Sequence, residues 1–171
     1  SDWFDGEIKE PNLAVLLDLV ALGTVADVVP LDSVNRTLVH QGLQRVRAGR
    51  CCVGIKAILE SAGRDFSNVV ASDFGFSVGP RLNAAGRLED MSLGIECLLT
   101  DNESYAREIA EWLNNLNQDR KKLEKAMRQQ ALAIMDDIQG ELGGDQLPSA
   151  LSLYHQEWHQ GVIGILASRI K

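Results

Sequence analysis

The stretch Leu16–Leu31, LLDLVALGTVADVVPL, is almost wholly apolar and yet carries Asp27 between Ala26 and Val28. The apolar spacing predicts a core-facing helix that begins near residue 13 and is ended or loosened by Gly23. Asp27 is therefore expected in a short segment just beyond a buried helix, a place where proteins often present a ligand.

A carboxylate in such an apolar run is costly to bury unless a cation, a metal ion or several hydrogen-bond donors meet it. Mg²⁺ and Mn²⁺ prefer carboxylate oxygens, and phosphoryl transfer often uses two such ions. Because one aspartate cannot build that site, two interpretations stay open. Asp27 is a metal ligand whose companions lie outside this sequence, or it caps a turn or pairs with an arginine.

The composition is that of a packed protein of 171 residues with 45% apolar residues, enough for one domain or for the ends of two joined by a connector. Three cysteines without a C-x-x-C motif predict neither zinc nor a disulfide framework, and favour a reducing compartment. No run reaches the roughly 18 apolar residues of a membrane span. We expect a soluble, cytoplasmic protein, and the two ends of the chain suggest an internal fragment.

The charge is unevenly distributed. The net charge of −7 argues against a self-sufficient nucleic-acid-binding protein, because phosphate affinity needs lysine and arginine. Between Asp32 and Glu60, however, all the charged residues are basic: Arg36, Arg45, Arg47, Arg50 and Lys56. This pattern is compatible with a nucleic-acid groove and equally with solvated helix faces.

Most of the remaining chain has helical periodicity. The spacing predicts helices near 34–46, 55–62 and 92–99, and a long one over about 101–139 that begins with a Thr100–Glu103 capping box. The apolar stripe of the long helix breaks at Arg120, which favours a connector over a coiled coil. Residues 66–77 are expected to be irregular or briefly extended.

The C-terminal segment predicts the opening of an α/β unit. Residues 141–149 have the composition of a boundary loop, 150–155 are expected to form a strand, and a helix should start at Val162. His159 lies at the start of this helix beside Trp158, where an imidazole could hydrogen-bond a phosphate oxygen. Trp158 could stack on a base or simply pack, and a metal site shared by His155 and His159 is disfavoured by their expected positions on a strand end and a loop.

A second candidate site is the segment 75–88, GFSVGPRLNAAGRL, in which Arg81 and Arg87 flank Asn83. Small residues allow close backbone approach, and guanidinium groups suit phosphates. The alternative is a tight helix–loop crossing with two surface arginines. Ser168 and Arg169 lie further along the C-terminal helix.

Five segments, in this order, closely resemble the RecJ single-stranded-DNA exonucleases of the DHH phosphoesterase superfamily. They are LDLVALGTVADVVPL, NRTLVHQGLQRVRAG, GFSVGPRLNAAGRLEDMSLGIECLL, LNNLNQDRKKLE and WHQGVIGILASR. The first and third are the most specific, and the resemblance covers nearly the whole chain.

The resemblance implies a mostly α fragment of an α/β protein: the end of a DHH domain (1–32), a helical connector (33–145) and the first strand–helix unit of a DHHA1 domain (146–171). It implies a 5′→3′ exonuclease that acts on single-stranded DNA in recombination and repair with Mn²⁺ or Mg²⁺, monomeric and not membrane-bound. Cys51-Cys52-Val53-Gly54 departs from the family, which usually has a proline before the glycine.

The resemblance also assigns roles to residues. Asp27 matches the last metal-binding aspartate of the DHH domain, and His159 matches the start of DHHA1, close to the cleft. Residues expected to contact DNA are Arg81, Asn83, Arg87, Ser168 and Arg169. The chain has no Asp-x-Asp, Asp-His-His or Gly-Gly-His motif, so we expect the fragment alone to be inactive.

Two other functions stay open on the sequence. One is a different DHH phosphoesterase that acts on short oligonucleotides, cyclic dinucleotides or pyrophosphate, although the long connector and the basic run favour a polymer. The other is a non-catalytic DNA-binding scaffold.

Overall fold

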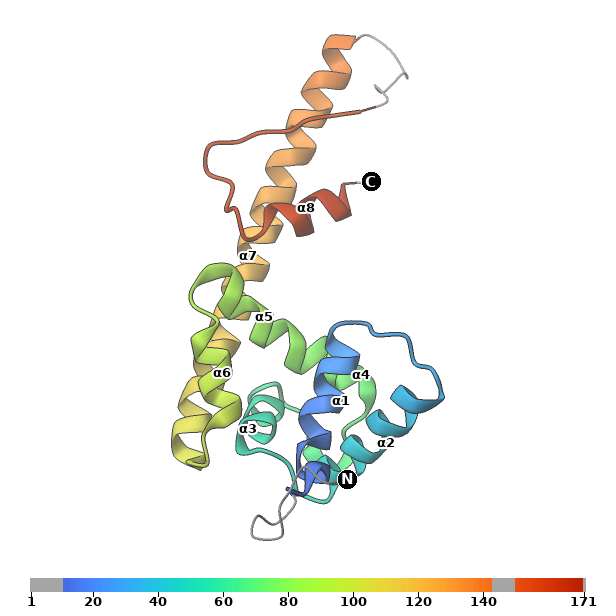
Figure 1. Ribbon diagram of the computed structural model, residues 1–171. Helices are drawn as coiled ribbons and strands as arrows, with labels where there is room; N and C mark the ends of the chain where they lie inside the picture. The colour runs from blue at the N-terminus through green and yellow to red at the C-terminus, as the bar shows by residue number, and fades with distance from the viewer. Residues whose placement is uncertain (1–10, 143–149, 171) are drawn as a thin grey trace.

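A computed structural model describes residues 11–142 and 150–170, and in these residues the chain is helical with no strand (Figure 1). The helices, in chain order, are α1 (Leu17–Ala26), α2 (Ser33–Arg47), α3 (Val53–Ser61), α4 (Ala71–Asp73), α5 (Gly79–Leu88), α6 (Ser92–Leu99), α7 (Glu103–Leu142) and α8 (Ile163–Arg169). A 3-10 turn, Leu13–Leu16, precedes α1, and another spans Phe66–Asn68. The prediction of a mostly helical chain is confirmed. In the described part of the chain, no helix combines the length and the apolar character needed to cross a membrane.

The long helix α7 organises the molecule. Helices α3, α5 and α6 pack against its N-terminal half, and α8 lies against its C-terminal half (Figure 1). Helices α1 and α2 pack on each other, further from α7. The larger hydrophobic cluster takes buried residues from α1, α2, α3, α5, α6, the Phe74–Val78 turn and α7 up to Leu116. A second, smaller cluster consists of Met127, Ala131, Val162 and Leu166. The prediction of a long connecting helix is confirmed, and the break in its stripe at Arg120 falls between the two clusters.

The N-terminus of α7 is capped by Asn102 and not by Thr100. The Asn102 side-chain oxygen accepts hydrogen bonds from the amides of Ser104 (3.0 Å) and Tyr105 (3.1 Å). The Thr100 hydroxyl instead accepts from the amide of Asn102 at 3.1 Å. Asparagine caps helices as well as threonine does, so the predicted Thr100–Glu103 capping box was wrong, although it located the helix start within two residues.

Helix α1 continues through Gly23 to Ala26, so the alternative in which Gly23 ends the helix was wrong. Glycine inside a helix costs about 1 kcal/mol relative to alanine. The complete burial of Ala21 and the near-complete burial of Leu22 against the core offset this cost and keep the helix intact through Gly23.

The glycine-rich segment 75–88 is helical, where a helix–loop crossing was one alternative. Helix α4 continues into a π-helical turn, Phe74–Val78, and then into α5, so that residues 71–88 form one helical run. Pro80 lies in the first turn of α5, directly after the π turn. Proline has no backbone N–H to donate, and the wider π turn accommodates the missing hydrogen bond. The prediction of an irregular or extended stretch up to residue 77 was therefore wrong for residues 71–77.

The predicted strand at 150–155 is not formed. Residues 151–155 have no regular secondary structure and run beside the C-terminal half of α7 (Figure 1). A strand needs a neighbour to accept and donate its ladder hydrogen bonds, and no other extended segment of the described residues is available for that pairing. The helix expected from Val162 is confirmed as α8.

Close helix contact between α1 and α2 depends on Gly42. A Cβ atom at this position would overlap the carbonyl oxygen of Leu17 and the Cβ of Ala21. Gly23, on the exposed side of α1, has nothing within 4 Å of the corresponding position. The two glycines therefore make a matched pair, one required by packing and one not.

We predict that Gly42→Ala lowers the free energy of unfolding by about 2–3 kcal/mol, because α1 and α2 must move apart. Gly23→Ala should raise it by up to about 1 kcal/mol through helix propensity. Urea unfolding followed by circular dichroism measures both. Equal stability of the two variants would contradict the α1–α2 packing described here.

Candidate functional site

Asp27 is the C-terminal cap of α1. Its amide donates to the carbonyl of Gly23 at 3.0 Å, and its carboxylate is exposed, without a hydrogen-bond or ion-pair partner among the described residues. It therefore neither caps a turn with its side chain nor pairs with an arginine in this part of the molecule. The carboxylate is free to accept a ligand.

The turn after Asp27 is strained. The amide of Val28 donates to Val25 O (3.2 Å) and that of Val29 donates to Thr24 O (3.0 Å), the pair of bonds of a Schellman motif. This motif places Val28 at φ +56°, in the left-handed region that glycine usually fills and that is an outlier for a β-branched residue. Such strain is concentrated at functional sites, and here it adjoins the candidate ligand.

Gly79 allows the π turn and the start of α5 to approach the end of α1, whereas a Cβ at Gly75 would make only an ordinary van der Waals contact. A Cβ at Gly79 would lie 3.3 Å from the Cβ of Ala26, and one at Gly75 would lie 3.6 Å from Cγ1 of Val25. The small residues of segment 75–88 thus permit the close backbone approach that the sequence suggested. They bring the π turn directly against the residues that precede Asp27.

The buried carboxylate of the opening stretch is Asp18, which the sequence analysis did not single out. Its side chain is 2% exposed and accepts hydrogen bonds from the amides of Cys52 (2.6 Å) and Leu19 (2.9 Å). The argument that a carboxylate in an apolar run needs donors is therefore correct for Asp18, whereas Asp27 escapes the cost by being exposed. Asp18 joins α1 to the start of α3.

As a metal ligand, Asp27 can supply one hard oxygen donor, the type that Mg²⁺ and Mn²⁺ prefer. Within residues 11–142 and 150–170, no three His, Cys, Asp or Glu side chains lie together as a metal cluster. Burial raises the pKa of the Cys52 thiol, next to Asp18, to about 12, so the thiol is protonated at neutral pH. The described residues therefore supply one carboxylate ligand of a metal site, that of Asp27.

Arg81 lies in the interior between α5 and α7. Its guanidinium group donates to the side-chain oxygen of Asn114 (2.9 and 3.2 Å) and to the carbonyl of Ser77 in the π turn (2.8 Å). Burial lowers the pKa of this guanidinium, which nevertheless remains charged. Arg81 is not the surface arginine of the structural alternative, and its expected DNA contact stays a prediction.

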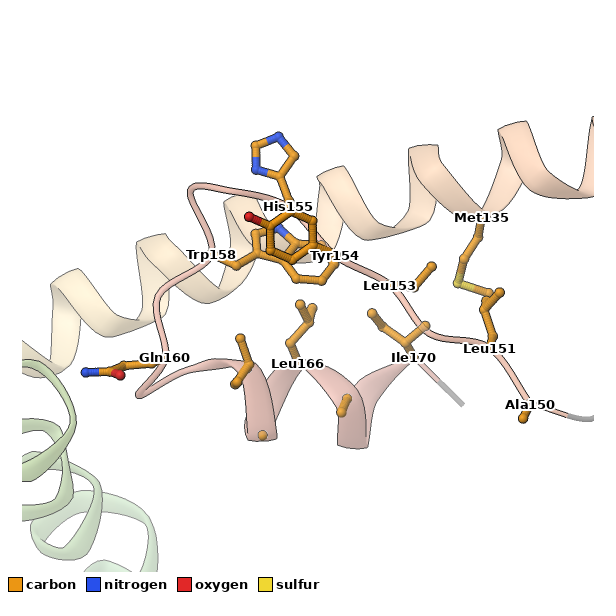
Figure 2. Close-up of a pocket in the computed structure, with 13 residues that line it drawn as sticks. Met135, Ala150, Leu151, Leu153, Tyr154, His155, Trp158, Gln160, Leu166 and Ile170 are labelled. Carbon is orange, nitrogen blue, oxygen red and sulfur yellow. The ribbon is translucent and has the colours of Figure 1, made fainter.

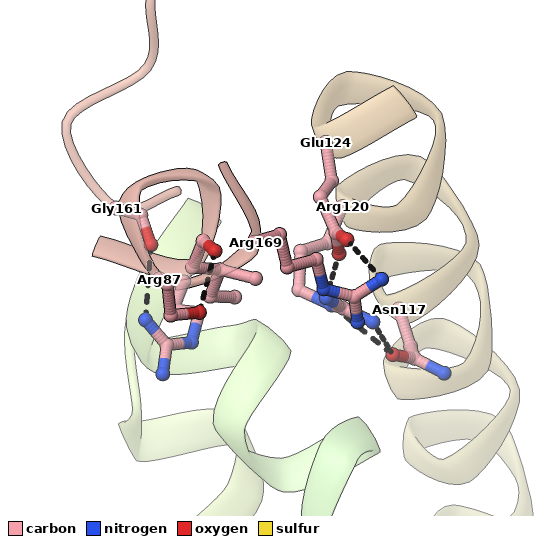
Figure 3. A network of polar contacts seen from close by, with 8 residues as sticks. Arg87, Asn117, Arg120, Glu124, Gly161 and Arg169 are labelled. Atoms are coloured by element: carbon pink, nitrogen blue, oxygen red, sulfur yellow. Dashed lines mark hydrogen bonds and ion pairs between the residues drawn. The ribbon is translucent and has the colours of Figure 1, made fainter. Parts of the chain in front are cut away.

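Asn83 and Arg87 lie four residues apart and share the exposed face of α5. Arg87 donates to the carbonyl of Gly161 at 3.1 Å, and a Cβ at Gly161 would overlap the carbonyl oxygen of Arg87 (Figure 3). The end of α5 is thereby held against the turn that begins α8. The structure brings Arg87 and the His159–Gly161 turn together, as a shared site would require.

His159 caps its own turn. Its ring Nδ1 accepts a hydrogen bond from the amide of Gly161 at 3.1 Å, and its carbonyl accepts from the amides of Val162 and Ile163. An acceptor at Nδ1 means that the neutral ring carries its proton on Nε2. His159 thus accepts from the amides of Gly161, Val162 and Ile163, of which only Ile163 belongs to α8, and the ring Nε2 is the available donor. A phosphate contact at this helix start stays a prediction.

Trp158 packs against α7. Its ring nitrogen donates to the side-chain oxygen of Gln130 at 3.0 Å, and the ring contacts the cluster that contains Met127. His155 stacks on it at 6.2 Å between ring centroids and uses its own Nδ1 to accept from the amide of Glu157. The packing alternative for Trp158 is what the structure shows.

A groove of about 970 Å³ lies between α8, residues 150–160 and α7 (Figure 2). Apolar side chains such as Leu153, Leu166 and Ile170 line it, and Tyr154 is exposed at its rim. His155 and Trp158, which the sequence offered for a metal site and for base stacking, line this groove, whereas Asp27, Arg87 and His159 do not. The groove therefore adjoins the His159 turn and does not include Asp27.

The last two candidates lie near the end of α8. The Ser168 hydroxyl donates to the carbonyl of Ile165 at 2.7 Å and is exposed. One guanidinium nitrogen of Arg169 lies 2.7 Å from a carboxylate oxygen of Glu124 on α7 (Figure 3). Glu124, together with its neighbour Arg120, was missed by the sequence analysis, although the break of the apolar stripe at Arg120 was the available signal.

Comparisons with known proteins agree with one another, although no protein-family model matches the chain. The chain is 59% identical over 170 residues to the single-stranded-DNA-specific exonuclease RecJ of Escherichia coli, covering 99% of this chain and 29% of that protein. It is 38% identical over 153 residues to RecJ of Thermus thermophilus, covering 90% of this chain and 21% of that protein. The chain therefore spans less than a third of the length of these relatives.

Solved structures show the same relationship. The crystal structure of Thermus thermophilus RecJ in complex with Mn²⁺ superposes with a TM-score of 0.78 at 37% identity, covering 94% of this chain and 23% of that one. A structure of exonuclease RecJ bound to manganese gives a TM-score of 0.80 at 37% identity and covers 94% of this chain and 38% of that one. A third structure, also of the Thermus thermophilus protein, is in complex with Mg²⁺.

We predict that Val28→Gly raises the free energy of unfolding by about 1 kcal/mol, because glycine adopts a positive φ without the steric cost that valine bears. Thermal and urea unfolding measure the change. Val34→Gly, which replaces an exposed valine in the first turn of α2, is the control and should destabilise. A loss of stability in Val28→Gly would contradict the strained turn.

Proposed function

The chain corresponds over nearly its whole length to a segment of the RecJ single-stranded-DNA-specific exonucleases, and we propose that it is part of a nuclease that degrades single-stranded DNA from the 5′ end. The observation that carries this proposal is the 59% identity over 170 residues with a protein of that name. We further propose that the whole protein acts in the cytoplasm as a monomer, in recombination and repair.

Asp27 is the proposed metal ligand. Its exposed carboxylate, which has no partner among the described residues, suits Mn²⁺ or Mg²⁺, the ions held by the Thermus thermophilus structures. When bound, such ions activate a water molecule and neutralise charge on the scissile phosphate. The Schellman turn and the close approach of Gly79 to Ala26 hold the Asp27 backbone in one conformation, so the carboxylate is presented without rearrangement.

The strand is proposed to lie along the junction of α5 with the start of α8. Asn83 and Arg87 share the exposed face of α5, and Arg87 is tied to Gly161 two residues from His159. The His159 Nε2–H can donate to a phosphate oxygen while Nδ1 stays bonded to the Gly161 amide. Ser168 and Arg169, both exposed further along α8, are proposed as additional contacts of the strand.

Arg81 differs from these residues in its surroundings. Its guanidinium joins α5 to α7 through Asn114, which supports a share in the site through the orientation of α5. For a direct contact with DNA, the strand displaces one of these internal bonds of Arg81.

The domain boundaries at residues 32/33 and 145/146 are also proposed. In the described residues, α1 and α2 lie on opposite sides of the first boundary but share one hydrophobic cluster. Helix α8, beyond the second boundary, packs on α7. The proposed domains are therefore defined by their correspondence to RecJ and are in mutual contact.

We predict that Asp27→Asn in the full-length nuclease abolishes cleavage of single-stranded DNA. Its free energy of unfolding should change by less than about 0.5 kcal/mol, because the side chain is exposed and makes no described contact. Asp18→Asn is the control. It should lose about 1–3 kcal/mol of stability, because the buried carboxylate accepts two amides.

Mn²⁺-dependent digestion and thermal unfolding of both variants are the measurements. Cleavage by Asp27→Asn at nearly the wild-type rate would remove Asp27 from the site.

The isolated 171-residue chain is expected to have no nuclease activity, because a metal pair needs more ligands than Asp27. A single strand labelled at its 5′ end and incubated with the chain and Mn²⁺ tests this expectation. Metal-dependent shortening that copurifies with the chain, and that Asp27→Asn removes, would show that the ligand set is complete without the flanking sequence.

A further inference from the structure

Glu124 makes the charged contact between α7 and α8. One of its carboxylate oxygens lies 2.8 Å from a guanidinium nitrogen of Arg120, one turn earlier on α7, and the other lies 2.7 Å from a guanidinium nitrogen of Arg169 on α8 (Figure 3). Each oxygen therefore holds a different arginine. Asn117 completes the group, since its side-chain oxygen accepts from Arg120 at 3.3 and 3.4 Å.

Glu124, Arg120 and Arg169 differ in how far their side chains are exposed to solvent. The Glu124 side chain is 8% exposed, Arg120 is 11% exposed and Arg169 is 55% exposed. A buried carboxylate needs charged partners to offset its desolvation, and the inner partner here is Arg120. The outer partner, Arg169, keeps about half of its side chain in solvent, where it can also meet a ligand.

The group carries one excess positive charge, since two arginines share one carboxylate. A guanidinium group has five N–H donors in a planar fork, and the contact with Glu124 engages one side of it. The donors of Arg169 that do not face Glu124 are left for an anion. An unrestrained arginine samples many rotamers, and fixing it before binding removes an entropic cost from the binding step.

We propose that Glu124 is a positioning residue, whose carboxylate, itself held by Arg120, fixes the guanidinium of Arg169 to receive a backbone phosphate of the DNA strand. The inference rests on the proposed function, in which Arg169 contacts DNA. It gives α7 an indirect part in strand binding, through a residue that orients Arg169 and does not touch the strand.

For the variant Glu124→Gln, a long-range charge effect and a positioning effect predict opposite changes in DNA affinity. Removing a negative charge near a polyanion-binding surface strengthens binding if only long-range attraction matters. Removing the residue that orients Arg169 weakens binding. Glu124→Asp keeps the charge and withdraws the carboxylate by one methylene group, so charge alone predicts no change and positioning again predicts weaker binding.

The test is a fluorescence-anisotropy titration of a labelled oligothymidylate with the full-length nuclease, without Mn²⁺ or Mg²⁺ so that the strand stays intact, at several salt concentrations. We expect Glu124→Gln and Glu124→Asp each to raise Kd about threefold to tenfold. Arg169→Gln should raise Kd and reduce the slope of log Kd against log salt by about one. In the Arg169→Gln background, Glu124→Gln should have no further effect.

The matched control is Glu103→Gln on the same helix. Glu103 pairs with Arg107 at 3.1 Å on the surface, and its loss should leave Kd unchanged or slightly lower. Thermal unfolding establishes that each variant is folded, and if Glu124→Gln is not, Glu124→Asp decides the question.

If the folded Glu124 variants bind DNA as tightly as the wild type or more tightly, while Arg169→Gln binds more weakly, then Glu124 does not position Arg169. The proposed contact of Arg169 with DNA is unaffected by that result. Unchanged binding by Arg169→Gln overturns the inference by removing the Arg169 contact. The proposed function is judged separately, by exonuclease activity of the unmodified protein.

Discussion

The uninterrupted backbone of α7 is the constraint on which the arrangement of the candidate site depends. Its 40 residues form one helix, roughly 60 Å long at 1.5 Å per residue. One half is buried in the large cluster with α1 to α6, and the other half packs with α8. Both groups of helices therefore pack on the same continuous helix, α3, α5 and α6 on one half and α8 on the other.

A short polar stretch interrupts the apolar face of α7 between its two halves. Between Leu116 and Met127 the inward positions are taken by Asn117, Arg120 and Glu124, where an unbroken apolar stripe would have merged the two clusters. Buried charge contacts contribute little net stability compared with apolar packing, but they are directional. The contact between Glu124 and Arg169 therefore selects one orientation of α8 on α7, and the bond from Arg87 to Gly161 selects the same orientation from α5.

Local sequence patterns predicted the long helices well and the chemical environment of single residues poorly. Periodicity located α2, α3, α6 and α7 because their apolar faces repeat over several turns. It failed at Gly23 and in segment 75–88, where packing against a neighbouring helix overrides the low helix propensity of glycine. The strand expected at 150–155 did not form, because strand formation depends on a pairing partner that composition does not reveal. Likewise, Asp18 and Asp27 lie in the same apolar stretch, and only the path of the chain after Ala26 makes one buried and the other exposed.

The candidate site came from family resemblance more than from local pattern. Asp27 is an isolated carboxylate in the sequence, and its significance follows from the free side chain and the strained Val28 beside it. The most direct test is anomalous X-ray diffraction from crystals of the full-length protein grown with Mn²⁺. The account predicts a manganese peak at about 2.0–2.3 Å from an Asp27 carboxylate oxygen. Manganese bound elsewhere, with the Asp27 carboxylate in solvent, would contradict it.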